Sequence, residues 1–298
     1  MKSQEKVCIL FLITISFYFI TSSVCSAQIA LPYGSPKANK QIYNLVPVSI
    51  AEKIAFKKAR DQWGKVSPGP YLEACDDDGD IVAYLFTFSI GASKFPNYKD
   101  IIAKIKYGRE IADKGVKSMH EDDKQKVKEK EAIELENFEN ALYKIADDVD
   151  AADPQPKPRF PTAEQIAKKI GHDMMTGADQ FGTVVVSARY DLFPVPLYMH
   201  YLPPYFYQGD IAMEKAKKLL SAQKVSLEKL YFFERERAPY FEFTAQGKSI
   251  LLNQYNLEAA EANEILTKKG KKPIPDLNEM DEITAEWDKS KKELYGNF

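Results

Sequence analysis

The chain has 298 residues, and its 41 Lys and Arg residues are nearly balanced by 43 Asp and Glu residues, for a formal net charge of −2. This balance argues against binding to nucleic acid, because proteins of that class carry basic surfaces that neutralise phosphates. With 45% hydrophobic residues, the chain is long enough to bury the core of one or two globular domains.

Residues 1–27 have the features of a secretory signal peptide. Two lysines precede an unbroken apolar run, and small and polar residues follow it. We expect cleavage after Ser26 or Ala27, which leaves no integral membrane domain and places the mature protein in the periplasm or outside the cell. Two alternatives stay open, namely a lipoprotein acylated on Cys25 and an uncleaved membrane anchor.

The first predicted α+β unit covers residues 48–94 and follows an N-terminal leader at residues 28–47. Its stretch SIAEKIAFKKARDQW places Ile50, Ile54 and Trp63 on one face of a helix. After the breakers of GKVSPGP come two strand-like runs, YLEA and IVAYLFTF. We therefore predict a helix followed by a β-hairpin.

The stretch EACDDDGD joins the two strand-like runs and has three readings. As a calcium loop it fails, because neither register combines glycine at position 6 with ligands at positions 1 and 12. As a nucleophile Cys75 is disfavoured, because its anionic neighbours raise the pKa of the thiol. Asp-Gly between strand-like runs is typical of a tight hairpin. We predict a solvated hairpin turn that binds no metal.

Residues 95–152 are predicted to form an insertion of two amphipathic helices. Apolar residues recur there at spacings of three, four or seven. They are Tyr98, Ile101, Ile105, Gly108, Ala112 and Met119 in one stripe, and Leu135, Phe138, Leu142, Ile145 and Val149 in the other. A polar stretch around KSMHEDDKQK separates the stripes, so we expect a helical hairpin. The insertion is either a solvated decoration or an arm that binds a partner.

The second predicted α+β unit covers residues 153–258 and shows the order of elements of the first. DIAMEKAKKLL is a predicted helix, and VSLEKLYFF, APYFEFTA and KSILLN are predicted strands. Four helix residues of the first unit, Ile54, Ala55, Lys58 and Ala59, match Ile211, Ala212, Lys215 and Ala216. We interpret the match as an internal duplication. A helical tail, residues 259–298, is broken at GKKPIP.

These repeated stretches suggest a family. AEKIAFKKA with DGDIVAYLFTF, and IAMEKAKKLL with YFEFTAQGKSI, resemble PepSY-type and streptopain-propeptide-type repeats, which are small α+β modules with a cystatin-like helix on an antiparallel sheet. The resemblance implies an exported protein of the kind that occurs as a peptidase propeptide, an inhibitor or a stand-alone envelope protein. It implies no catalytic residues. The helical insertion and a tyrosine-rich segment depart from the family pattern.

That segment, residues 189–210, is rich in tyrosine and proline. Its prolines exclude a regular central strand, and tyrosine combines a large contact area with a polar tip. We predict that Tyr198, Tyr201, Tyr205 and Tyr207 form the surface that binds the partner. The alternative is that the segment covers the sheet as an edge strand and strap.

The sequence shows no G-x-S-x-G, phosphate-loop or Cys-x-x-Cys motif, and its three histidines lack metal-ligand spacing. We therefore expect no catalytic residue, no metal and no cofactor. The expected function is non-catalytic binding of a protein, with a peptidase or an envelope component as the partner. The alternative is a secreted hydrolase whose active site is not visible in the sequence.

Overall fold

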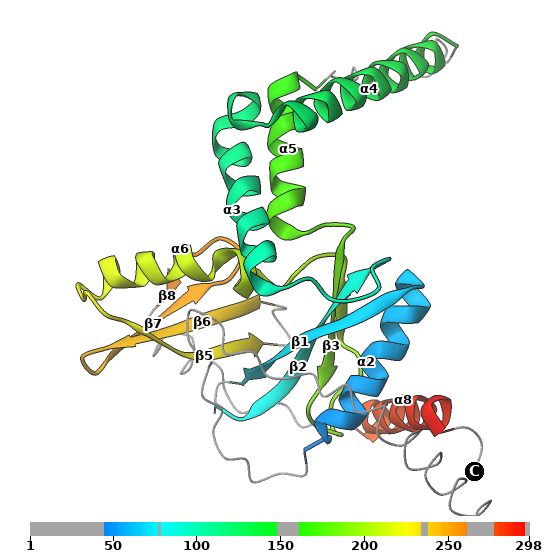
Figure 1. Cartoon of the computed structure of the whole chain (residues 1–298). Helices are drawn as coiled ribbons and strands as arrows, with labels where there is room; N and C mark the ends of the chain where they lie inside the picture. The colour runs from blue at the N-terminus through cyan, green and yellow to red at the C-terminus, as the bar shows by residue number, and fades with distance from the viewer. Residues whose placement is uncertain (1–44, 77–78, 148–160, 234–237, 261–276, 296–298) are drawn as a thin grey trace, which may run out of the picture.

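The computed structural model describes residues 45–76, 79–147, 161–233, 238–260 and 277–295. Within these ranges, the chain forms six α-helices and one sheet with the strand order β4-β3-β2-β1-β5-β6-β7-β8 (Figure 1). The predicted α+β class is confirmed. The predicted signal peptide and its cleavage site lie outside the described residues.

The first half of the fold is a helix followed by four antiparallel strands, each paired with the next one in the chain. These elements are α2 (Val48–Trp63), β1 (Val66–Cys75), β2 (Ile81–Ile90), β3 (Phe181–Ser187) and β4 (Leu197–Met199). The predicted boundary at residues 152 and 153 therefore does not separate two halves, because β3 pairs along β2 although the whole helical insertion lies between them in sequence.

The second half has the same order of elements. It consists of α6 (Pro204–Leu219), β5 (Ser226–Phe233), β6 (Ala238–Ala245), β7 (Lys248–Asn253) and β8 (Ala259–Ala260). The two halves join where β1 runs parallel to β5, with Cys75 opposite Tyr231. Each half is thus a helix followed by an antiparallel meander.

The two helices cover opposite faces of the sheet, which β2 shows directly. Alternate side chains of a strand point to opposite faces. Tyr84, Phe86 and Phe88 belong to the apolar core under α2, whereas Ala83 and Leu85 belong to the core that α6 shares. The whole of β2 up to Ser89 is therefore buried, which explains why its sequence is a continuous apolar run and does not alternate.

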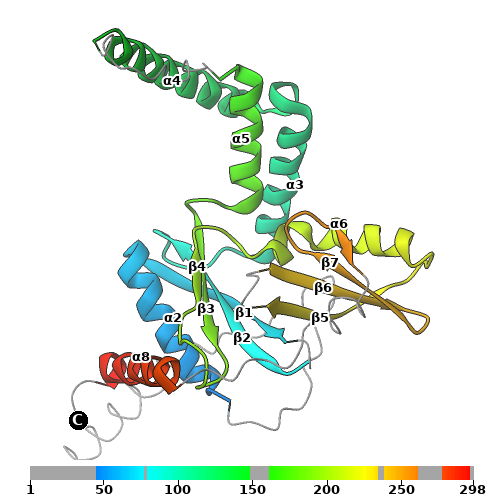
Figure 2. The same ribbon diagram turned by 180° about the vertical axis from the view of Figure 1, so that it is seen from behind.

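The helical insertion consists of α3 (Tyr98–Lys114), a 3-10 turn (Gly115–Ser118), α4 (Glu121–Asp147) and α5 (Ala163–Thr176). The predicted hairpin of the first two helices is wrong. Helix α3 lies along α5, while α4 leads away from the body (Figures 1 and 2). The reason is a close contact of backbones, since a Cβ built on Gly171 would lie 2.4 Å from the Ala112 backbone nitrogen and 2.6 Å from the Gly108 oxygen.

Helix α8 (Leu277–Tyr295) forms the described part of the C-terminal tail and packs on α2. Its Ile283 and Trp287 side chains are buried in the α2 core. The indole Nε1 of Trp287 donates a hydrogen bond to the Leu192 oxygen at 2.7 Å, so the tail also contacts the segment between β3 and β4.

Strands β1 and β2 pair as the predicted hairpin, and the described residues of its turn are Asp76, Gly79 and Asp80. The Asp76 nitrogen donates to the Asp80 oxygen at 2.9 Å, and the Asp80 nitrogen donates to Asp76 Oδ1 at 3.0 Å. Gly79 has φ of +82°, a backbone conformation that favours glycine. The turn is less solvated than expected, because the Asp76 side chain is buried with its Oδ2 atom 3.9 Å from Arg189 Nη1.

Cys75 should be chemically inert in the folded protein. Burial, more than its acidic neighbours, raises the pKa of its thiol to about 12, whereas an unfolded thiol has a pKa of about 8.5. We expect iodoacetamide at pH 8.5 to alkylate Cys75 more than about 100-fold more slowly in the native protein than in guanidinium chloride, because the thiolate is the reactive form. Peptide mapping by mass spectrometry measures both rates, and equal rates would contradict the burial.

The same shift makes stability depend on pH. Between pH 8.5 and about 12 the folded thiol keeps its proton while the unfolded chain releases it. The contribution of Cys75 to stability is therefore fully present below this range and declines as the pH rises through it.

Candidate functional site

The structure separates the four tyrosines that we predicted to form one binding surface. Tyr198 on the edge strand β4 is 42% exposed, and Tyr201 is half-buried. Tyr205 and Tyr207 are buried, so the expected surface is not continuous. The ring of Tyr198 lies under the ammonium group of Lys58 on α2, 4.4 Å from it.

The burial of Tyr205 and Tyr207 follows from where α6 begins. We expected this helix from Asp210 onward, but it starts at Pro204. Proline is tolerated there because the N–H groups of the first helical turn have no partner within the helix, so the N–H group that proline lacks is not missed. Both tyrosines are therefore on its first turn and belong to the apolar core. The ring of Tyr205 lies 6.2 Å from that of Phe241, and burial raises the pKa of Tyr207.

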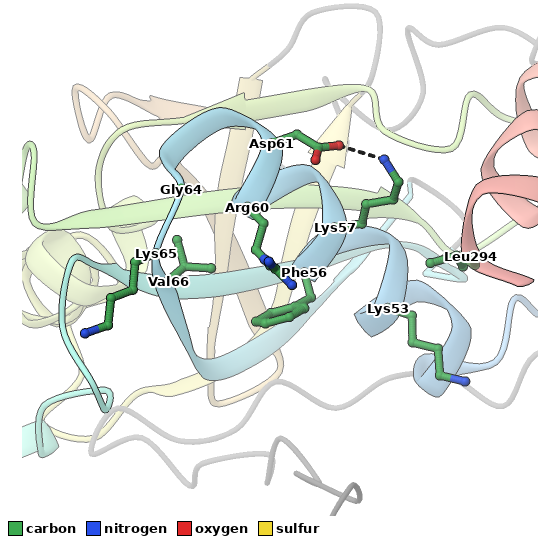
Figure 3. Close-up of a pocket in the computed structure, with 9 residues that line it drawn as sticks. All are labelled: Lys53, Phe56, Lys57, Arg60, Asp61, Gly64, Lys65, Val66 and Leu294. Atoms are coloured by element: carbon green, nitrogen blue, oxygen red, sulfur yellow. Dashed lines mark hydrogen bonds and ion pairs between the residues drawn. The ribbon is translucent and has the colours of Figure 1, made fainter. Parts of the chain in front are cut away.

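A groove along the outer side of α2 is the candidate site (Figure 3). It has a volume of about 840 Å³ and is open to solvent. Its lining comes from α2, from the turn into β1 and from the end of α8, namely Lys53, Phe56, Lys57, Arg60, Asp61, Gly64, Lys65, Val66 and Leu294. Phe56, Val66 and Leu294 are half-buried against the α2 core and form its apolar part.

Positive charge dominates the groove, with four basic side chains and one acidic side chain among the residues that line it. Lys57 Nζ lies 2.8 Å from Asp61 Oδ2 and 3.0 Å from Glu293 Oε2. These hydrogen bonds, first to Asp61 and then to Glu293, raise the pKa of Lys57. The positive charge of Lys57 is therefore already balanced by carboxylates of the chain itself.

Arg60 and Lys65 differ from Lys57 in this respect. The Arg60 guanidinium carbon lies 5.9 Å from the centre of the Phe56 ring, and Figure 3 shows the two side chains together in the groove. In the part of the chain that the structure describes, no carboxylate lies within ion-pair distance of Arg60 or Lys65. These two cations can therefore pair with an incoming anion.

The sequence did not lead us to predict this groove, although a signal for it was present. Lys53, Lys57 and Arg60 are spaced by four and three residues, which aligns them on one side of a helix. The apolar partners Val66 and Leu294 come from other elements, and no local pattern predicts that they lie beside that side of the helix.

The histidines make structural contacts in the described residues. Trp63 Nε1 donates a hydrogen bond to His200 Nε2 at 2.8 Å. The His120 backbone nitrogen donates to the Tyr107 hydroxyl oxygen at 2.8 Å, and that hydroxyl donates to Asp123 Oδ2 at 2.7 Å, which holds the start of α4 against α3. Over the described ranges, no three His, Cys, Asp or Glu side chains are grouped to hold a metal ion.

Comparisons with protein-family models, curated proteins and solved structures gave no match to this chain. Among the helices that the structure describes, none is long and apolar enough to cross a membrane.

Proposed function

We propose that this chain is an exported, non-catalytic binding protein that acts in the cell envelope or outside the cell on a protein partner, with a peptidase as the first candidate. The observation that carries the proposal is the α2 groove, because it is an open surface that combines an apolar strip with two uncompensated cations, Arg60 and Lys65. Interfaces use such mixed surfaces, with apolar side chains at the centre and charges that orient the partner.

Two observations support binding over hydrolysis. A cysteine nucleophile needs a lowered pKa, and burial raises the pKa of Cys75 to about 12. A carboxylate pair, the other common device of hydrolases, does not line the groove, where Asp61 is the acidic residue and is ion-paired with Lys57. The resemblance of the repeats to peptidase propeptides and inhibitors supports a peptidase as the partner, and the predicted signal peptide at residues 1–27 supports export.

The experiment is a titration of the purified chain into a streptopain-type cysteine peptidase, with hydrolysis of a fluorogenic peptide as the readout. We expect a reversible loss of peptidase activity that is complete near one equivalent, and no hydrolysis of casein by the chain alone. Full peptidase activity at a tenfold excess of chain would exclude this partner. Hydrolysis of casein by the chain alone would contradict a non-catalytic function.

A further inference from the structure

We propose that the α2 groove binds an extended acidic segment of a protein partner in which an apolar side chain lies between two carboxylates. This inference rests on the proposed function and specifies the chemistry of the ligand at the same site. Three properties of the groove lead to it, namely its charge, its apolar strip and its length.

Charge complementarity selects an acidic ligand. Lys57 is held by Asp61 and Glu293. Lys53 also has an interaction within the chain, so among the described groove residues the cations left for a ligand are Arg60 and Lys65. The Arg60 guanidinium carbon is 5.9 Å from the centre of the Phe56 ring, and the guanidinium group can present its N–H groups to a carboxylate. The neighbouring Lys65 can pair with a second carboxylate as a point charge.

The apolar strip selects against a simple inorganic anion. Phe56, Val66 and Leu294 line the groove beside the cations and are half-buried against the α2 core. A phosphate or sulfate ion would leave this strip in contact with water. An apolar side chain between two carboxylates would cover it, at a gain of about 25 cal/mol for each Å² of apolar surface removed from water.

The length of the groove fits an extended peptide. From Lys53 to Gly64 the helix advances roughly 16 Å at 1.5 Å per residue. An extended chain covers this distance with about five residues at 3.3 Å each. A nucleic acid strand is a poorer ligand, because the formal net charge of the whole chain is −2 and most of its surface would repel a polyanion.

The probe is a fluorescein-labelled peptide with the core Glu-Ser-Leu-Ser-Glu between Gly and Ser residues, in which the two Glu and the Leu side chains share one face of an extended chain, and binding is measured by fluorescence polarisation at low ionic strength. We expect saturable binding to the full chain. Peptides with the core Gln-Ser-Leu-Ser-Gln or Glu-Ser-Ser-Ser-Glu should bind at least about tenfold more weakly, because each lacks one of the two interactions. Equal binding of all three peptides would overturn the inference.

Variants locate the binding. We expect Arg60→Glu combined with Lys65→Glu to weaken binding of the Glu-Ser-Leu-Ser-Glu peptide at least about tenfold. The matched control is Lys99→Glu with Lys106→Glu, which makes the same change in net charge on the exposed side of α3 and should leave the affinity within about twofold. Equal losses of affinity in the two double variants would mean that net charge alone attracts the peptide. Unchanged affinity of the variant with Arg60→Glu and Lys65→Glu would mean that the peptide binds outside the groove.

Circular dichroism checks whether the groove pair, the variant with Arg60→Glu and Lys65→Glu, is folded. If it is not, Arg60→Gln with Lys65→Gln replaces it as a milder change.

The experiments distinguish failure of this inference from failure of the proposed function. If the groove pair still inhibits the peptidase fully, the ligand inference is wrong and the function stands. If the peptide binds as expected but the peptidase is not inhibited, the groove does bind acidic segments and the peptidase is the wrong partner.

Discussion

Replacing Tyr205 by alanine is expected to lower the free energy of unfolding by about 3 to 5 kcal/mol, the range found when a buried aromatic side chain is truncated. Tyr205 is fully buried at the start of α6. Its ring lies 6.1 Å from that of Phe206 and 6.2 Å from that of Phe241 on β6. Truncation would leave a cavity between the helix and the second half of the sheet, where these side chains cannot fully close it.

The matched control is Tyr198→Ala, in the same tyrosine-rich segment. Tyr198 is 42% exposed and its described partner is the Lys58 ammonium group above its ring. Loss of one exposed cation–π contact should cost less than about 1 kcal/mol. Guanidinium chloride unfolding followed by circular dichroism measures both variants. A small loss for Tyr205→Ala would show that this ring is not part of the core.

Replacing Gly171 by leucine is expected to destabilise the insertion by about 3 kcal/mol or more. A Cβ at this position would lie 2.4 Å from the Ala112 nitrogen and 2.6 Å from the Gly108 oxygen. Inserted side-chain atoms usually cost about 1 to 3 kcal/mol in a packed core. The cost here is at the upper end or above it, because backbone atoms cannot rotate away as a side chain can.

The control for Gly171→Leu is Ala103→Leu, which adds leucine at an exposed position of α3 and should change stability by less than about 0.5 kcal/mol. Hydrogen exchange gives a local readout. We expect Gly171→Leu to speed exchange in α3 and α5, while the strands of the sheet keep their protection. Unchanged exchange in both helices would contradict the close contact of α3 with α5.

Part of this fold follows from short stretches of sequence. The β1–β2 hairpin is predicted by two strand-like runs with Asp-Gly between them, and the structure places Gly79 at φ of +82° there. The helical periodicity of residues 49–63 likewise predicts most of α2. These features are predictable because their determinants, a turn residue that tolerates positive φ and a periodic apolar face, lie within a few residues of one another.

The rest depended on contacts between segments distant in the chain. Apolar stripes indicated amphipathic helices in the insertion, but the bare surfaces of Gly108 and Gly171 decide that α3 packs on α5. Tyrosine-rich composition indicated a binding surface, but the start of α6 at Pro204 turns Tyr205 into the core. The sequence gives the chemical type of each side chain, whereas the exposure of that side chain depends on which distant segment of the chain covers it. The sequence by itself therefore determined the local elements and the α+β class. Only the tertiary structure decided the partner of each helix and the position of the groove beside Arg60 and Lys65, because both are set by the shape of packed surfaces.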